Sequence, residues 1–254
     1  MIIKSVQNQI FKEALNIQDK KFRDENGFFF VEGKKQIDEI PSDWTVKQFF
    51  ISENYKNYIT DFKNIVTLSE RLFNKLSAVR SPQGIMAVVK KKCYDVKEVV
   101  KNTGLFIILD NIQDPGNLGT IIRSADAFGV KAVFVSKRSA DIYSDKTLRA
   151  TMGSIFHLPV LENIDIKNLL MLMKKENISV FAASLKGEKY LNTVKFPSKS
   201  VFIVGNEAHG LQNDVESSAD MIVRIHMSGA ESLNAAVAAS IIMYEMSKQL
   251  SLHN

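Results

Sequence analysis

Three short segments between residues 114 and 236 gather polar side chains that could bind and orient a ligand, and the first two of them contain glycine. They span residues 114–119, 205–211 and 231–236, and Arg123 follows the first of them. Each lies where an apolar stretch, predicted to be a strand, gives way to a predicted helix. In α/β proteins such strand ends converge on one crevice of the sheet. The pattern therefore predicts that the three segments form a single ligand site.

The first segment, Asp114 to Gly119, admits two interpretations. In one, Asn117 is only a helix N-cap, and Arg123 pairs with Asp126 on an exposed helix face. In the other, Asn117 and Arg123 lie on the same side of the helix start. There the exposed amides and the guanidinium would together bind an anion such as a phosphate. The residues alone leave both open.

The second segment begins at Gly205, directly after the predicted strand 201–204. A missing side chain at that point lets a ligand approach the backbone. Glu207 stands where a dinucleotide-binding G-x-G-x-x-G loop has its second glycine, so a carboxylate would repel a pyrophosphate and favours hydroxyls or a cation. Glu207 could instead be a first-turn carboxylate favoured by the helix dipole. The chain contains no G-x-x-x-x-G-K-[ST] loop, so NTP hydrolysis has no support.

The third segment leads into a final helix rich in small residues. Ser232 could be its N-cap and Asn234 an ordinary early-helix residue, or both could contact a ligand. The small residues at 235–240 permit close approach to the sheet or to a second subunit. The apolar run 241–244 exceeds what one sheet face needs and favours a helix-mediated dimer.

Composition bounds the class of protein. A chain of 254 residues with 45% hydrophobic residues suits one large or two ordinary soluble domains. The net charge is +5, and residues 1–95 carry 16 Lys and Arg against 12 Asp and Glu, a weak pointer to a nucleic-acid partner. A single cysteine, Cys93, excludes an internal disulfide framework and a multi-cysteine zinc site. The four histidines lack H-x-x-x-H spacing, so no metal is expected. No signal peptide or membrane span is expected either.

A basic segment, Lys90–Asp95, predicts a junction between two parts, 1–95 and 96–254. The first part is predicted to be a small α/β unit, with strands at 28–31, 47–51, 65–68 and 85–89. In the second part, apolar strands alternate with helices, which indicates a parallel sheet with helices on both faces. The predicted strands are 105–109, 132–136, 179–183, 201–204 and 221–225. The predicted helices are 118–128, 144–151, 164–176, 211–217 and 232–250.

The three segments together resemble the motifs of the SpoU (TrmH) family of the SPOUT superfamily. The matching residues are Pro115, Asn117, Gly119, Arg123 and Ala127–Gly129, then Gly205, Glu207, Gly210 and Leu211, then Ile225, Met227 and Ser232–Asn234. Residues 1–95 resemble the substrate-binding domain, similar to ribosomal protein L30e, that often precedes the catalytic domain. The residues that carry this likeness are Ser5, Val6, Asn8, Phe30–Gly33 and Pro82–Ile85. The resemblance covers nearly the whole chain.

The resemblance implies an RNA ribose 2′-O-methyltransferase that uses S-adenosylmethionine. It implies a C-terminal trefoil knot, a rare exception among folds, and a homodimer that completes the active site. The residues expected to contact the cofactor are Gly205, Ile225 and Leu233. The residues expected to form the catalytic set are Asn117, Arg123, Glu207, Ser232 and Asn234. Arg123 is expected to bind a phosphate and help lower the pKa of the ribose hydroxyl, since a guanidinium is a poor base.

Two departures from the family pattern fall on the cofactor loop. His226 replaces a common proline, and the segment between Met227 and Ser232 is about one residue shorter than in many relatives. Structured RNA is the expected partner, ribosomal RNA rather than tRNA, in the cytoplasm. The alternatives are a tRNA 2′-O-methyltransferase, a non-catalytic RNA-binding protein on the same scaffold, and a nucleotide-dependent oxidoreductase that lacks the glycine fingerprint. Neither the target nucleotide nor its base follows from the residues.

Overall fold

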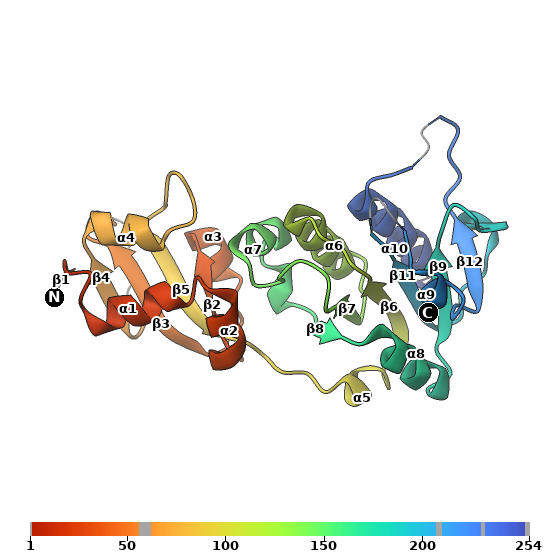
Figure 1. The fold of residues 1–254 in the computed structure, drawn as a ribbon, viewed down its shortest axis with the longest axis horizontal. Coiled ribbons are helices and arrows are strands. Elements are labelled where there is room, and N and C mark those ends of the chain that lie inside the picture. The colour runs from red at the N-terminus through yellow and green to blue at the C-terminus, as the bar shows by residue number, and fades with distance from the viewer. Residues whose placement is uncertain (1, 56–61, 207–209, 230–231, 252–254) are drawn as a thin grey trace. The chain divides into compact units, whose positions relative to one another are not determined.

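The computed structural model describes residues 2–55, 62–206, 210–229 and 232–251, and the chain divides into two compact units (Figure 1). The first unit comprises Met1–Lys92 and Tyr143–Arg149, and the second Cys93–Ile142 and Ala150–Asn254. The sequence predicts a junction after residue 95. Residues 143–149 group with the first unit because the Tyr143 ring packs on Phe29, with ring centroids 4.5 Å apart, and lies 4.5 Å from Lys91 Nζ.

The first unit is built on a mixed sheet with α-helices packed against it. In spatial order its strands are β1 (Ile2–Ile3), β4 (Ile65–Leu68), β3 (Val46–Ser52), β5 (Ile85–Lys90) and β2 (Phe28–Glu32). The helices are α1 (Gln9–Asn16), α2 (Lys20–Asn26), α3 (Lys34–Asp38) and α4 (Glu70–Leu76). Phe11 of α1 and Phe73 of α4 join Phe50 and Met86 of the sheet in one buried cluster. All four strands predicted here are present, while β1 and α2 were not predicted.

The second unit contains an all-parallel sheet. Its spatial order is β10 (Lys189–Tyr190), β12 (Met221–Arg224), β9 (Ser179–Ala183), β11 (Lys199–Val204), β6 (Gly104–Leu109), β7 (Ala132–Ser136) and β8 (Val160–Ile164). The predicted parallel sheet is confirmed, as are all five strands predicted for it. Two strands were not predicted: β8, in which the polar Glu162 and Asn163 interrupt the apolar pattern, and β10, which has only two residues. Both are edge strands and carry weaker apolar patterns than the buried ones.

Helices cover both faces of this sheet, as predicted. Leu169 and Met173 of α8 and Val215 of α9 pack with Phe106 and Ile108 on one face. On the other face α10 contacts β6 and β11, and α6 contacts β7. The helical segments of this unit are α5 (Val96–Val99), α6 (Pro115–Ala127), η1 (Ser154–Phe156), α8 (Ile166–Lys175), η2 (Leu191–Thr193), α9 (Asn213–Glu216) and α10 (Ala235–Ser251), while α7 (Asp145–Thr151) lies mostly in the first unit.

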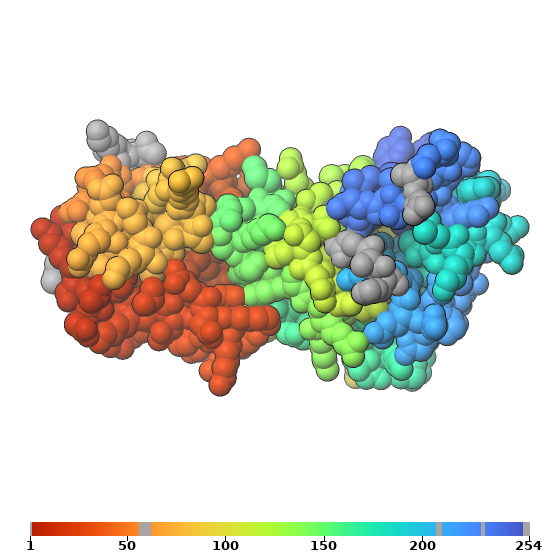
Figure 2. Space-filling view, turned by 45° about the horizontal axis from the view of Figure 1, so that its top comes forward, coloured from red at the N-terminus to blue at the C-terminus, as the bar shows by residue number. Residues whose placement is uncertain are grey.

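The strand order determines where the functional segments meet. The chain runs from β6 outward through β7 to β8, then crosses to β9 on the other side and returns to insert β11 between β9 and β6. A reversal of this kind leaves a crevice at the carboxyl ends of the strands. The ends of β9, β11 and β12 share that edge because the strands are parallel neighbours. Helices α6 and α10, far apart in sequence, lie side by side there (Figure 2).

A search of the described residues finds no helix that is both long and apolar enough to span a bilayer.

One partly buried carboxylate in the first unit, Glu32, links β2 to the end of α4. The Ser77 hydroxyl donates to Glu32 Oε1 at 2.6 Å, and the Ala78 amide donates to Glu32 Oε2 at 3.3 Å. Burial is the largest influence on Glu32 and raises its pKa above the usual value of 4.5, although both hydrogen bonds act in the opposite direction.

This shift predicts a pH dependence of stability. A raised folded-state pKa means that folding favours protonated Glu32, so its contribution is present below the unfolded-state pKa and is lost as pH rises through the folded-state value. Glu32→Gln should therefore melt at a temperature that rises relative to wild type as the pH increases from about 4 to about 6. Thermal melts followed by circular dichroism test this, and a difference that stays constant with pH would contradict it.

Candidate functional site

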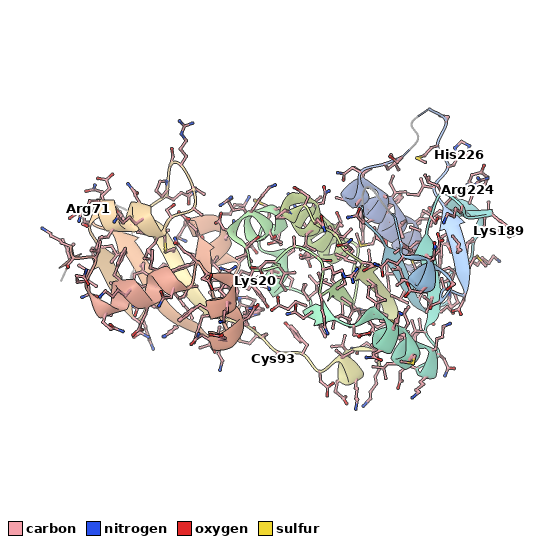
Figure 3. The ribbon with its side chains drawn as sticks, viewed as in Figure 1. Lys20, Arg71, Cys93, Lys189, Arg224 and His226 are labelled. Atoms are coloured by element: carbon pink, nitrogen blue, oxygen red, sulfur yellow. The ribbon has the colours of Figure 1, made fainter. Side chains whose placement is uncertain are left out.

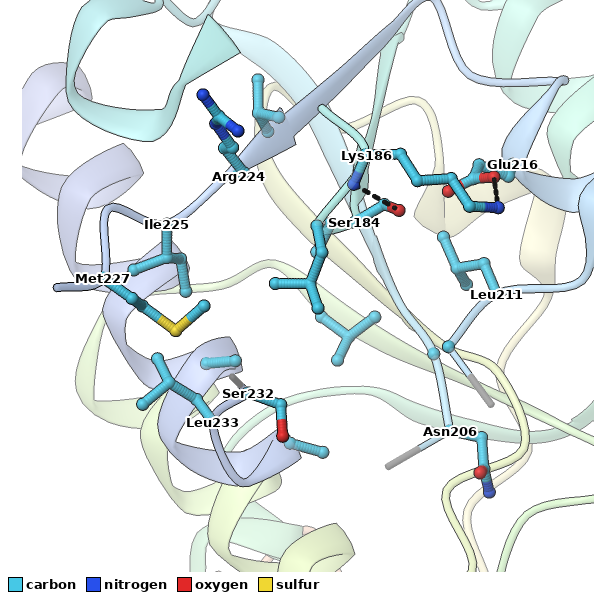
Figure 4. A pocket seen from close by; sticks show the side chains of 18 residues that line it. Ser184, Lys186, Asn206, Leu211, Glu216, Arg224, Ile225, Met227, Ser232 and Leu233 are labelled. Atoms are coloured by element: carbon cyan, nitrogen blue, oxygen red, sulfur yellow. Dashed lines mark hydrogen bonds and ion pairs between the residues drawn. The ribbon is translucent and has the colours of Figure 1, made fainter. Parts of the chain in front are cut away.

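A cavity of about 390 Å³ lies at the carboxyl ends of β9, β11 and β12, beside the start of α10. Gly205, Ile225 and Leu233, the three residues expected to contact the cofactor, all line it, and so does Ser232 (Figure 4). The structure therefore brings the second and third segments to one cavity, as the sequence predicts. Glu207 and Glu231 lie outside the described residues.

Glycine is required at position 205 because the backbone of Gly210 passes close to it. A Cβ at this position would lie 2.5 Å from both the carbonyl carbon and oxygen of Gly210. Asn206 and Gly210 are paired by two backbone hydrogen bonds, from Asn206 N to Gly210 O (3.1 Å) and from Gly210 N to Asn206 O (2.9 Å). Gly210 itself has a φ of +65°, which glycine adopts without strain. The two glycines thus allow Asn206 and Gly210 to pair at the end of β11.

Hydrogen bonds join the third segment to the first, and the second segment to Asn111, three residues before the first. Asn206 Nδ2 donates to the carbonyl of Asn111, which follows β6, at 2.9 Å. Asn234 Nδ2 donates to Asn117 Oδ1 at 3.0 Å, across an interval of 117 residues in the chain. The starts of α6 and α10 are therefore adjacent, and the amides of both helix N-termini lie at the same edge of the sheet, where they favour an anionic ligand.

The helix caps differ from the simpler interpretations considered for the sequence. Asp114, not Asn117, caps α6 by accepting from the Asn117 amide at 2.8 Å. Asn234, not Ser232, caps α10, because its Oδ1 accepts from Ala236 N (2.9 Å) and Val237 N (3.3 Å). Asn234 thus fixes the end of α10 with its oxygen while its nitrogen holds Asn117. The interpretation of Asn117 as an N-cap is wrong.

Arg123 is exposed on α6 and has no hydrogen-bond or ion-pair partner among the described residues. The interpretation that paired it with Asp126 is wrong, because Asp126 Oδ2 lies 2.8 Å from His157 Nδ1 instead. Arg123 is also not among the residues that line the cavity. Its guanidinium is therefore available to a ligand outside that cavity.

The cavity also contains polar side chains that the sequence analysis missed. The Lys186 ammonium lies 3.3 Å from a carboxylate oxygen of Glu216, a buried residue, and Ser184 Oγ accepts from the Lys186 amide at 3.3 Å (Figure 4). Ser184–Gly187 follows β9 as directly as Gly205 follows β11. The same argument about strand ends could have identified it. Arg224, at the end of β12, lines the cavity as well.

Burial also perturbs a carboxylate at this edge of the sheet. It raises the pKa of Asp110, which ends β6, although the Ser136 hydroxyl and the charge of Arg138 act in the opposite direction. Within the described ranges, no group of three or more His, Cys, Asp or Glu side chains is placed to hold a metal ion. The donors at this edge are thus amides, hydroxyls and side-chain charges.

Comparison with protein families identifies both parts of the chain. Residues 104–244 match the SpoU rRNA Methylase family, and residues 8–87 match an MRM3-like substrate binding domain. The chain belongs to the SpoU rRNA methylase family. A relative from Bacillus subtilis, a 23S rRNA (guanosine(2553)-2′-O)-methyltransferase, is 32% identical over 249 residues, which are 96% of this chain and 98% of the relative.

Solved structures agree with this assignment. An AdoMet-bound rRNA methyltransferase from Sinorhizobium meliloti is 27% identical, covers 98% of both chains and superposes with a TM-score of 0.87. The SpoU methyltransferase AviRb from Streptomyces viridochromogenes, in complex with AdoMet, is 26% identical and covers 96% of this chain and 98% of its own, with a TM-score of 0.88. The predicted reaction class, RNA ribose 2′-O-methylation with S-adenosylmethionine, is confirmed.

The close approach at Gly205 generates a direct prediction. Gly205→Ala should force the Gly210 backbone to move, because backbone atoms cannot yield as a flexible side chain can, and overpacking of this kind costs about 1–3 kcal/mol. We expect a lower melting temperature and at least about tenfold weaker binding of S-adenosylmethionine by calorimetry.

Gly229→Ala is the matched control, since a Cβ there has no atom within 4 Å. Wild-type cofactor affinity in Gly205→Ala would show that the loop tolerates a side chain and that this part of the site is described incorrectly.

Proposed function

We propose that this protein transfers a methyl group from S-adenosylmethionine to a ribose 2′-hydroxyl of 23S ribosomal RNA. The observation that carries the proposal is the meeting of all three segments, with the Asn117–Asn234 hydrogen bond beside a cavity lined by Gly205, Ile225 and Leu233. Because the proposed substrate is ribosomal RNA, the proposal places the protein in the cytoplasm.

The residues present suit the cofactor. Leu185, Met227 and Leu233 give the cavity apolar surface for a heterocycle, while the Lys186–Glu216 pair offers polar atoms to hydroxyl and charged groups. The volume of about 390 Å³ is within the range of small-molecule pockets. When bound, S-adenosylmethionine supplies a methyl group on a positively charged sulfur. The chain's own residues then have to place a ribose hydroxyl in line with that group.

The catalytic roles follow from position and charge. Asn117 and Asn234 hold each other and the two helix starts, so they orient the reacting ribose. Arg123 binds a phosphate next to that ribose, and its positive charge lowers the pKa of the hydroxyl. A guanidinium titrates above about 12 and is not itself an efficient base. Ser232, at the cavity wall, and Glu207 complete the set.

Ribosomal RNA is favoured over tRNA by how much of the chain each kind of relative covers. The two rRNA methyltransferase structures from Sinorhizobium meliloti cover 98% of this chain. Two structures named for tRNA cover 59% and 62%, with TM-scores of 0.55 and 0.53. The Bacillus subtilis relative, named for a guanosine in 23S rRNA, covers nearly the whole chain. We therefore propose a guanosine of 23S rRNA as the target.

The two-part organisation extends the proposal. Residues 1–95 act as an L30e-like RNA substrate-binding domain, supported by the substrate-binding match over 8–87 and the basic excess in this part. Residues 96–254 act as the methyltransferase domain. The insertion of β11 between β9 and β6, and the tight packing of Gly187 against the Val223 backbone, support a trefoil knot around the cavity.

The family and its relatives named as 2′-O-methyltransferases count against a non-catalytic RNA-binding protein on the same scaffold. The complete set of motif residues argues against it, as does the formed cavity. Calorimetry separates the two, because the alternative predicts no binding of S-adenosylmethionine. Family membership removes the oxidoreductase alternative.

Arg123 provides the sharpest test of the reaction. Cells that lack this protein, complemented with wild type, should regain one 2′-O-methyl mark in 23S rRNA, mapped by sequencing of alkali-resistant positions. Arg123→Ala should fail to restore it yet bind S-adenosylmethionine with wild-type affinity, because Arg123 lies outside the cavity wall. Lys175→Ala, an exposed cation on α8, serves as the control. Full methylation by Arg123→Ala would remove Arg123 from the mechanism.

The final helix supports a homodimer. Val237, Ile241 and Tyr244 are 47%, 37% and 54% exposed on one face of α10, and the Tyr244 ring contacts Phe128, beside α6, at 5.8 Å. A second copy packed on this face would cover the exposed apolar surface and bring its own Arg123 to the interface between the two copies. Two copies would then complete the site.

Ile241→Lys should therefore convert the protein to a monomer and reduce methylation by at least about tenfold, since burying an unpaired charge costs several kcal/mol. Light scattering coupled to size exclusion measures the mass. Met171→Lys, which changes an exposed apolar residue on α8, should leave both properties unchanged. A wild-type protein that is already monomeric and active would refute the dimer.

A further inference from the structure

The edge of the second sheet beside the cavity contains a cluster of one aromatic and three basic side chains, of which only Arg224 also lines the cavity. Tyr190 and Arg224 are direct partners in the parallel pairing of β10 with β12. Lys189 precedes Tyr190, and His226 follows β12 after one residue. Figure 3 shows Lys189, Arg224 and His226 at the same edge of this unit.

The contacts in this cluster organise the Arg224 guanidinium. It stacks over the Tyr190 ring at 4.4 Å and donates from Nη2 to the Tyr190 hydroxyl at 3.0 Å. Its Nε is buried and has no hydrogen-bond partner in the described part of the chain. The arginine is thus held in one orientation by an aromatic face, with several N–H donors left over. This arrangement is well suited to a phosphate, because the side chain loses little further entropy on binding.

His226 extends the cluster outward. Its ring lies 5.4 Å from the Tyr190 ring at an angle of 46°, and both His226 and Lys189 are exposed. Glu188 is the acidic neighbour in the chain and is also exposed. His226 stands where the family commonly has proline, so this chain gains an exposed aromatic ring at that position. Aromatic faces next to cations are the usual means by which proteins hold single-stranded RNA.

The position of the cluster excludes a ligand held wholly inside the cavity. Arg224 lines the cavity, but its guanidinium points away from the other labelled side chains of the cavity (Figure 4). Lys189, Tyr190 and His226 do not line the cavity. A ligand at this edge therefore lies outside the cavity and directly beside it.

We propose that Tyr190, Arg224 and His226 form a binding site for the RNA strand that flanks the target nucleotide. Arg224 binds a phosphate of that strand, with Lys189 adding charge, and the His226 and Tyr190 rings hold an adjacent base. This inference rests on the proposed function, since the RNA is the one whose ribose is methylated. These side chains position the substrate and take no part in the chemical step.

The experiment uses the full-length protein and an in vitro transcript of 23S ribosomal RNA. We expect Arg224→Gln to raise the KM for RNA about tenfold, as for loss of one charge-assisted hydrogen bond, and to weaken binding of S-adenosylmethionine by a smaller factor. Filter binding over a series of KCl concentrations gives the slope of the logarithm of the RNA binding constant against the logarithm of the salt concentration. This slope should be smaller in magnitude by about one for Arg224→Gln than for wild type. Arg224→Lys should keep the wild-type slope because it keeps the charge.

Two further variants test the stacking and the location. Tyr190→Phe keeps the ring and should retain most of the RNA affinity, whereas Tyr190→Leu should lose it by about tenfold. Lys175→Gln removes one exposed charge on α8 and should leave the KM unchanged.

The proposal is overturned if Arg224→Gln leaves RNA affinity and salt slope unchanged, or if it weakens cofactor binding instead. A variant that loses RNA affinity, cofactor affinity and thermal stability together would also overturn it, because that result would show that the cluster only holds β10 in place. The binding measurements do not require activity. If wild type binds the transcript but does not methylate it, the proposed function fails while this site is still tested.

Discussion

The hydrogen bond between Asn234 and Asn117 is the interaction on which the functional site depends. One side chain does two things at once, because its oxygen caps α10 and its nitrogen holds the start of α6. Two helices from distant parts of the chain thereby begin at the same edge of the sheet. The Ser124 and Ser240 hydroxyls, 2.8 Å apart, maintain the alignment farther along the same pair of helices. Without the Asn234–Asn117 hydrogen bond, the cavity would not be held in a fixed position relative to the polar side chains of α6.

The sheet supplies the second constraint. Because β11 inserts between β9 and β6, the loops after β9, β11 and β12 all reach the same cavity. This crowding leaves no room for a side chain at Gly205 and Gly187. A Cβ at these positions would lie only 2.5 Å and 2.8 Å, respectively, from a backbone atom. Close backbone packing leaves room in the cavity lining for apolar side chains such as Leu185, Met227 and Leu233 and for the Lys186–Glu216 pair. The glycines are thus part of the cavity's construction, whatever else the loops contact.

Much of this could be predicted from the sequence, and particular residues show where prediction stopped. Buried strands such as 132–136 and 179–183 were predicted with the observed bounds, because continuous apolar runs have few alternatives in a parallel sheet. Gly205, Ile225 and Leu233 were predicted to meet and do line one cavity. The cap of α10 was not predicted, because Ser232 and Asn234 are both good caps and only tertiary contact with Asn117 favours one of them. The pairing of β10 with β12 rests on Tyr190 and Arg224, and a two-residue strand has no period to detect.

A double-mutant cycle on Asn117 and Asn234, read as single-turnover methylation rates of 23S rRNA, tests the central claim most directly. If the two side chains act as one unit, each single alanine variant should lower the rate by a similar factor. The double variant should then be hardly slower than either single variant, giving a coupling energy of about 1 kcal/mol or more. Rate losses that simply multiply in the double variant would show that the two asparagines act independently. That result would contradict the account of a site assembled through their hydrogen bond.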